Sequence, residues 1–340
     1  KDKIYFYIIS KNISYICAYN KGVILMNKKN NDNTTERIIL VATLYYKEKL
    51  SQQEIAQRLG VSRPWISKLL KKAEDMGLVK IEIQSPVFGN EHLEKKLHEV
   101  YPNTDIRIID TSDNSQDYLA MAAVHFFVSK IQPSDTIGIG WGNAVSRFVN
   151  AMIPLNYPET KTVPLAGSFG TTFETLPNYN SIKLAEKIGG QANVLHIPAY
   201  CKSQEEYKPL INNEETQRIL SMGEHADILI VGIGTFSSSF LTKNQILTAS
   251  EQQELYNSNA VGDIILQFID EYGEPIKTEV TERLIHANIY ISRKNVRHII
   301  GIAQGKEKVK VLQGVLKKQL VDTLFIDIET AHELLYDNQL

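Results

Sequence analysis

Hydrophobic residues recur at helical spacing in two adjacent stretches early in the chain. The apolar positions of these stretches are Ile55, Ala56, Leu59, Ile66, Leu69, Leu70 and Ala73. Residues three and four apart share one face of a helix, so each stretch is predicted to bury that face. Gly60 lies between the two stretches and tolerates the left-handed conformation that ends a helix. The pattern therefore predicts two short helices joined by a tight turn.

Polar residues predict where these helices begin. Ser51 and Glu54 have the spacing of a capping box, in which each side chain accepts a hydrogen bond from the other residue's amide. Ser62 is expected to cap the second helix, and Pro64 lies in its first turn, where proline removes no helical hydrogen bond. Residues 78–83 then alternate like a short strand or wing. This order of elements is typical of a helix-turn-helix DNA-binding module.

The second helix carries a basic face opposite its apolar face. We expect its first turns to read base edges in the major groove and its later lysines to lie near phosphates. The residues expected to contact DNA are Ser51, Gln52, Ser62, Arg63, Pro64, Trp65, Ser67, Lys68, Lys71 and Lys72. The alternative is a helical hairpin with a solvated lysine face. Residues 36–84 hold nine Lys or Arg against six Asp or Glu, whereas residues 85–340 hold 22 against 31, so positive charge is concentrated where DNA would lie.

After residue 90, apolar runs alternate with helical patterns. The runs expected to be strands are residues 105–110, 136–140, 162–167, 193–198, 228–234, 262–270, 298–303 and 322–327. The helices expected between them include residues 91–101, 116–131, 143–152, 181–188 and 306–320. Strands that alternate with helices predict a parallel sheet with helices on both faces. The fold class is therefore α/β, with a helix-turn-helix domain followed by a Rossmann-like domain.

Four glycine-rich loops follow strands of the predicted sheet. They are residues 138–144, 166–172, 232–236 and 303–306. Ligands of such sheets bind beyond the carboxyl ends of the strands, where glycine amides and helix N-termini favour anions. Any one of these glycines could simply mark a tight turn, but four loops at one edge favour an anion site. Asp263 could accept hydrogen bonds from sugar hydroxyls, although a strand-start cap is an equally simple interpretation.

Composition limits the remaining possibilities. A length of 340 residues is enough for two domains, and no apolar run is long enough to span a membrane. Cys17 and Cys201 form neither a disulfide framework nor a metal pair, as expected for a cytoplasmic protein without a metal or cofactor. Residues 1–35 read as an atypical N-terminal extension. One hypothesis is that Met26 is the natural start, and the alternative is a strand or amphipathic arm.

The motifs together resemble the SorC/DeoR-type transcriptional regulators of bacteria. The resemblance runs from residue 36 to the C-terminus and is carried by residues 55–81, 138–144, 165–168, 261–264 and 301–331. It implies a homotetramer that binds operator DNA through residues 36–84. It also implies that residues 85–340 bind a phosphorylated sugar, mediate oligomerisation and fold like sugar-phosphate isomerases. Members of this family repress or activate carbohydrate-catabolism operons.

The resemblance also implies which residues bind the effector. Together with the glycines of the neighbouring loops, the expected effector-binding residues are Gly140, Trp141, Gly142, Asn143, Ala144, Gly167, Ser168, Gly234, Asp263 and Lys306. Two positions depart from the family pattern. Ala144 stands where many members have a hydroxyl residue, and Ser168 stands where many have a second glycine.

An enzyme with a fused DNA-binding module is the alternative function. Deaminases of this fold place acid–base residues in the loop after the strand that corresponds to residues 228–234. Here that loop reads GIGTFSSSF and contains neither a carboxylate nor a histidine, which general acid–base catalysis requires. No lysine lies in the first or second loop for Schiff-base chemistry. The sequence therefore favours a sensor over an enzyme, and the anion loops argue against a regulator that binds only protein partners.

Overall fold

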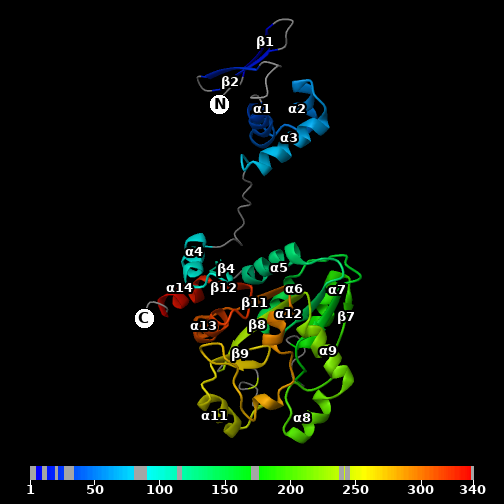
Figure 1. The fold of residues 1–340 in the computed structure, drawn as a ribbon, viewed down its shortest axis with the longest axis vertical. Helices are drawn as coiled ribbons and strands as arrows, with labels where there is room; N and C mark the ends of the chain where they lie inside the picture. The colour runs from blue at the N-terminus through cyan, green and yellow to red at the C-terminus, as the bar shows by residue number, and fades with distance from the viewer. Residues whose placement is uncertain are drawn as a thin grey trace. The chain divides into compact units, whose positions relative to one another are not determined.

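The computed structural model describes residues 5–9, 14–19, 22–26, 34–79, 90–112, 117–169, 176–236, 241 and 246–337. The chain divides into two compact units, Lys1–Gln84 and Ser85–Leu340, whose elements are labelled in Figure 1. In the first unit, β1 (Tyr5–Ile9), β2 (Ser14–Tyr19) and β3 (Gly22–Met26) form an antiparallel sheet. The alternative interpretation of this extension, a strand or an amphipathic arm, includes strands. The hypothesis that Met26 is the natural start stays a prediction.

The helix-turn-helix elements form as the apolar pattern predicts. They are α1 (Thr34–Ala42), which continues as the π-helical turn η2 (Thr43–Lys47), followed by α2 (Gln52–Leu59) and α3 (Arg63–Asp75). The predicted stripes meet in one core with Ile38 and Leu44, where Ile55 and Ile66 are fully buried. Residues 80–83 of the predicted wing lie outside the described residues.

The predicted turn chemistry holds with one difference. Ser51 and Glu54 form the capping box, and Gly60 ends α2 with φ 63°. Ser62 occupies the N-cap position of α3, but its side chain makes no capping hydrogen bond. Pro64 removes one first-turn amide, and the amide of Trp65 donates to the Ser62 carbonyl oxygen at 3.1 Å. The backbone therefore takes the place of the expected side-chain cap.

The second unit is built on a parallel sheet, as predicted. Its strands run in the order β4 (Asp105–Ile109), β12 (Thr323–Asp327), β11 (His298–Ile302), β8 (Ile228–Thr235), β5 (Thr136–Ile139), β6 (Lys161–Pro164) and β7 (Gln191–Ala192). A hairpin of β9 (Gly262–Ile264) and β10 (Gln267–Ile269) pairs antiparallel with the end of β8. The hairpin therefore lies at the carboxyl edge of the central strand.

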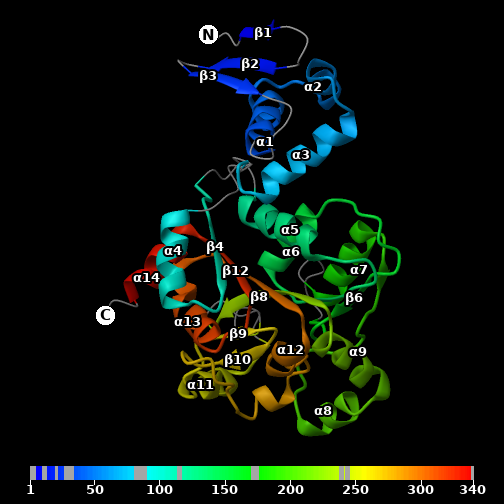
Figure 2. The same ribbon diagram turned by 45° about the horizontal axis from the view of Figure 1, so that its top comes forward.

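Helices cover both faces of this sheet, as Figures 1 and 2 show. On one face pack α5 (Tyr118–Lys130), α6 (Asn143–Ala151) and α7 (Pro177–Ile188). On the other pack α4 (Glu91–Val100), α9 (Glu214–Glu224), α12 (Ile289–Asn295), α13 (Val309–Lys317) and α14 (Ile328–Asp337). In β8, Ile228 and Ile230 pack on the face covered by α5, α6 and α7, whereas Leu229 and Val231 pack on the opposite face. This alternation explains why the central strand is apolar throughout.

Three predicted elements were wrong in detail. Residues 193–198 are not a strand: after Ala192 the chain makes only an isolated bridge between Pro198 and Ser168. Residues 262–270 are a hairpin, whose turn at Ile265 and Leu266 has φ values of 51° and 67°. Residues 306–320 start as the 3-10 turn η4 (Lys306–Lys308), and α13 ends at Lys317. Helix ends and tight turns depend on local contacts that a repeat pattern does not encode.

Candidate functional site

The loop after β5 lies directly on the backbone of β8. The amide of Gly140 donates to the Ile230 carbonyl oxygen at 2.8 Å, and a Cβ atom on Gly140 would lie 3.2 Å from that oxygen. A Cβ atom on Gly232 would lie 3.1 Å from the carbonyl oxygen of Trp141. Glycine on both sides therefore permits the close approach of the loop to the central strand. Gly140, Trp141, Gly142 and the start of α6 are thus fixed at the carboxyl edge of the sheet.

The N-terminus of α6 begins at a glycine at this edge. Gly142 has φ 93° and no side chain with which to cap the helix. The first amides of a helix have no partner within the helix and lie at the positive end of its dipole. Asn143 is exposed, and Ala144, which is partly buried, supplies no hydroxyl group. The main chain at Asn143 and Ala144 therefore offers donors to an anion, as the glycine-rich sequence predicts.

Asp263 lies beside Gly234 at the same edge. The two residues are paired between β9 and β8, and a Cβ atom on Gly234 would approach the Asp263 Oδ1 to 2.8 Å. Asp263 is only 4% exposed, and its Oδ2 accepts a hydrogen bond from the Leu266 amide at 3.1 Å. Burial raises the pKa of this carboxyl to about 6, against the opposing effects of the Leu266 amide and the Lys308 ammonium. Asp263 is therefore a buried carboxylate near a cation rather than a simple strand cap.

Lys308 is the cation that interacts with Asp263, and it is not among the effector-binding residues predicted from the sequence. Its pKa is lowered by burial, against the opposing effects of Glu307, Asp263 and Asp327. Lys306, the predicted lysine, is exposed at the start of η4. Lys306 and Lys308 are the first and last residues of the 3-10 turn, and they differ in exposure. The predicted helix start at residue 306 did not indicate this difference. Assignment of either lysine to the effector stays a prediction, and the geometry favours Lys308.

Arg147 links α6 to the loop after β11. Its Nη2 donates to the Gln304 Oε1 at 2.9 Å, and its Nε lies 3.2 Å from the Asp117 Oδ2. Arg147 also contributes to the lowered pKa of Lys308, since two nearby cations repel each other. Arg147 and Lys308 are therefore close enough to interact, and each also has acidic neighbours: Asp117 for Arg147, and Glu307, Asp263 and Asp327 for Lys308.

In the described part of the second loop, the amides of Gly167 and Ser168 contribute to packing of the main chain. The Gly167 amide donates to the Ile285 carbonyl oxygen at 3.0 Å, and the Ser168 amide donates to that of Ile197 at 2.9 Å. A Cβ atom on Gly167 would lie 2.5 Å from the Pro198 carbonyl oxygen, so this glycine permits close backbone contact. The two amides are already used and cannot serve as the expected anion donors. The Ser168 hydroxyl accepts a hydrogen bond from the Asn178 side chain at 3.2 Å. Binding of the effector by this hydroxyl stays a prediction.

Phe169 joins the second loop to the first. Its ring lies 5.1 Å from the ring of Trp141, at an interplanar angle of 37°. On the opposite side, the buried Asn180 of α7 donates from Nδ2 to the Gly140 carbonyl oxygen at 3.4 Å. The structure thus joins Trp141 to Phe169 and Gly140 to Asn180 through contacts, whereas Asp263 contacts Gly234. Residues 170–172 of the second predicted loop lie outside the described residues.

Most of the DNA-binding candidates on α2 and α3 are exposed. Those that are exposed are Ser51, Ser62, Arg63, Pro64, Ser67, Lys68, Lys71 and Lys72. Gln52 is partly buried, and Trp65 packs against the helix-turn-helix core. The Tyr46 hydroxyl donates to Glu74 at 2.7 Å and so ties η2 to the last turn of α3. The core therefore holds α3 rigidly while its basic face stays accessible.

Two absences concern only the part of the chain that the structure describes. Among the described residues, no cluster of His, Cys, Asp and Glu could hold a metal ion. No helix in the same ranges has both the length and the apolar character needed to cross a membrane.

Substitution of Asp263 by asparagine tests its burial through pH. The pKa of this carboxyl in the folded state is about 6, above its ordinary value, so the carboxylate destabilises the fold increasingly as pH rises from about 4 through 6. Asp263→Asn should therefore raise the free energy of unfolding by up to about 3 kcal/mol at pH 7.5 and by little at pH 4. Urea unfolding at both pH values measures the difference.

Asp110→Asn is the matched control. Asp110 is exposed, and hydrogen bonds from Ser112 lower its pKa, so its carboxylate contributes stability above the ordinary pKa that is lost as pH falls. Removing that charge should lower stability at pH 7.5. An equal effect of Asp263→Asn at both pH values would contradict the raised pKa.

A chain with a helix-turn-helix unit and a parallel-sheet unit that carries glycine-rich loops at one edge has the architecture of a ligand-responsive transcriptional regulator. Residues 85–336 match the family model Sugar-bind, described as "Putative sugar-binding domain", and residues 33–86 match the MarR family model MarR_2. The chain belongs to the Sugar-bind family and is a transcriptional regulator of the SorC/DeoR type.

Named relatives extend over nearly the whole chain. The sequence is 27% identical over 305 residues to the deoxyribonucleoside regulator of Bacillus subtilis (strain 168), which covers 88% of this chain and 97% of that protein. It is also 27% identical over 319 residues to the sorbitol operon regulator of Klebsiella pneumoniae, covering 90% and 99%. The solved full-length regulator SorC from Klebsiella pneumoniae shares the fold, with a TM-score of 0.67, 24% identity and coverage of 90% and 100%. The protein is therefore a DNA-binding transcriptional regulator and not an enzyme.

Proposed function

We propose that this regulator controls a carbohydrate-catabolism operon and that a phosphorylated sugar is its effector. The supporting observation is the N-terminus of α6, which lies at one sheet edge with the buried Asp263 and the partly buried Lys308. A phosphate would accept from the α6 amides, with Lys308 as a counter-charge. Asp263 would accept from sugar hydroxyls. The relatives named for deoxyribonucleoside, erythritol and sorbitol pathways support the carbohydrate class.

In this proposal residues 36–84 bind operator DNA and residues 85–340 bind the effector and form the oligomer, a homotetramer that acts in the cytoplasm as a repressor. Effector binding changes the balance between two states of the oligomer, of which one spaces its helix-turn-helix pairs to match operator half-sites. A ligand shifts this balance only by its difference in affinity for the two states. The sign of the response depends on which state the sugar phosphate prefers.

Calorimetry with a panel of pentose and hexose phosphates, each paired with its unphosphorylated sugar, tests the proposal. We expect at least one phosphate to bind, to shift the midpoint of operator binding, and to bind far more tightly than its parent sugar. Light scattering of the same samples measures the oligomeric state. Binding of a parent sugar as tightly as its phosphate would contradict the anion site, and a folded protein that binds operator but no member of the panel would contradict the effector class.

Two lysines of α3 should affect operator binding differently. Lys68 lies near the start of the helix, so Lys68→Ala should cost about 1–3 kcal/mol on the operator and little on unrelated DNA. Lys71 lies one turn later, so Lys71→Ala should weaken binding to all DNA and reduce the slope of log affinity against log salt by about one for each module bound. Titrations at several salt concentrations measure both effects. Lys310 is exposed and lies outside the module, so Lys310→Ala is the control and should change neither the DNA affinity nor its salt dependence.

A further inference from the structure

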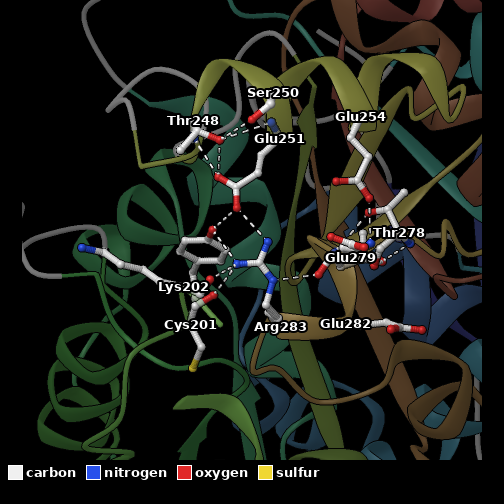
Figure 3. A network of polar contacts seen from close by, with 12 residues as sticks. Cys201, Lys202, Thr248, Ser250, Glu251, Glu254, Thr278, Glu279, Glu282 and Arg283 are labelled. Carbon is white, nitrogen blue, oxygen red and sulfur yellow. Dashed lines mark hydrogen bonds and ion pairs between the residues drawn. The ribbon is translucent and has the colours of Figure 1, made fainter. Parts of the chain in front are cut away.

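Arg283 is a buried cation with many hydrogen-bond partners in the protein. It lies in the 3-10 turn η3 (Thr281–Arg283) and is only 7% exposed. Its guanidinium donates to the carbonyl oxygens of Cys201 at 3.0 Å, Lys202 at 2.6 Å and Glu279 at 2.9 Å. It also donates to the Tyr200 hydroxyl at 3.0 Å and to the Glu251 Oε1 at 2.7 Å (Figure 3). This side chain therefore joins three separate segments of the chain.

Glu251 ties this cation to the start of α11 (Ala249–Asn257). Its Oε1 accepts from Arg283 and from the Tyr200 hydroxyl, while its Oε2 accepts from the amide and the hydroxyl of Thr248, each at 2.8 Å. Thr248 and Glu251 form the capping box of α11, as Figure 3 shows. Burial opposes ionisation, but the hydrogen bonds from Tyr200, Arg283 and Thr248 lower the pKa of Glu251 to about 2. One carboxylate thus begins α11 and fastens it to Arg283.

Main-chain hydrogen bonds lead from Arg283 to the second loop of the candidate site. The Cys201 amide donates to the Arg283 carbonyl oxygen at 3.0 Å, and the Ile285 amide donates to that of Ala199 at 2.8 Å. The next bond is from the Gly167 amide to the Ile285 carbonyl oxygen at 3.0 Å. The segments around residues 200 and 285 therefore form a short ladder that ends at the loop just before Phe169.

Side chains make the same connection. Leu255 of α11 lies in one buried cluster with Phe169 and Leu284, and Trp141 packs against that cluster. Phe169 in turn contacts the ring of Trp141, which immediately precedes the start of α6. The backbone ladder and the apolar cluster therefore converge on the same pair of rings.

We propose that Glu251 and Arg283 are positioning residues of the effector site, whose ion pair docks α11 and holds the loops that carry Phe169 and Trp141. The role as an effector site rests on the function proposed above. The pair acts through packing and main-chain geometry, since Arg283 is buried and its hydrogen bonds run to other segments of the protein. Removing the negative charge leaves a buried cation without its partner, which is strongly unfavourable. The loops should then lose their fixed geometry before the sheet unfolds.

Trp141 provides the readout. In a Trp65→Phe background Trp141 is the one remaining tryptophan of the sequence, so its fluorescence reports the site. In that background we expect Glu251→Gln to increase the rate of quenching by acrylamide about twofold or more and to weaken binding of inorganic phosphate about tenfold, as the breaking of a buried ion pair would allow. The quenching rate and the phosphate affinity are both measured well below the midpoint of thermal unfolding. If the ion pair only stabilised the fold, its loss would lower that midpoint without exposing Trp141 at these temperatures.

Glu215→Gln is the matched control, because Glu215 pairs with Arg218 on the exposed surface of α9. Its quenching and phosphate affinity should equal those of the parent. If Glu251→Gln does not fold, Tyr200→Phe decides the question, since it removes one hydroxyl from the network and keeps the ring; a smaller change in the same direction supports the proposal. Unchanged quenching in the folded variant overturns it. A parent protein that binds neither phosphate nor any sugar phosphate contradicts the proposed function, while acrylamide quenching still tests the positioning role.

Discussion

Lys308→Met is expected to weaken binding of a phosphorylated effector about a hundredfold, because a charge-assisted hydrogen bond to an anion contributes about 1.5–3 kcal/mol. Methionine retains most of the side-chain volume and removes the positive charge. Lys308 lies partly buried near Asp263 and Arg147, so its charge acts where water screens it little. Calorimetry with the sugar phosphate that binds the parent protein measures the loss, and operator affinity without ligand should be unchanged.

Lys306→Met is the comparison for this experiment. Lys306 is two residues away and exposed, so its loss should change phosphate affinity less than about threefold, as for a solvent-screened charge. The resemblance to SorC/DeoR-type regulators assigned the phosphate to this lysine. A large loss for Lys306→Met together with a small loss for Lys308→Met would restore that assignment and contradict the geometry of η4.

Gly262→Ala should cost about 3 kcal/mol in the free energy of unfolding, at the upper end of what overpacking of a core usually causes. A Cβ atom on Gly262 would lie 2.1 Å from the Gly234 carbonyl oxygen and 2.7 Å from the Val311 Cγ2. The first of these neighbours is backbone and cannot rotate away, so β9 would have to move from β8. Urea unfolding followed by tryptophan fluorescence measures the loss.

Gly223→Ala separates overpacking against backbone from contact with a flexible side chain. A Cβ atom on Gly223 would meet the end of the Leu165 side chain at 2.8 Å, and the substitution favours the helical conformation of α9. We therefore expect its effect to stay within about 1 kcal/mol of zero. Equal losses for both substitutions would mean that the β8–β9 contact is not the cause.

Local chemistry explains why the DNA-binding unit could be predicted from the sequence. The capping box of Ser51 and Glu54 involves residues three apart, and the apolar stripes of α2 and α3 have helical spacing. The alternation of strands and helices was equally clear, since the parallel strands are apolar on both faces. In each case the determining contacts lie close together in the sequence.

Contacts between distant segments explain what could not be predicted. Arg283 is not among the effector-binding residues predicted from the sequence, and it is buried by partners at positions 200 and 251 that no spacing rule relates to it. The amides of Gly167 and Ser168 are used by residues 285 and 197, so a glycine-rich loop that looked open is already bonded. The assignment of Lys306 stays a prediction, and the influence of Lys308 on Asp263 depends on a single 3-10 turn that the repeat pattern does not encode.

The uncapped start of α6 has a consequence for how such a regulator would respond in the cell. An electropositive helix end attracts any small anion, including free inorganic phosphate. Resting phosphate would then compete with the effector and raise the concentration at which the switch operates. The activation threshold should therefore follow the phosphate status of the cell as well as the supply of sugar.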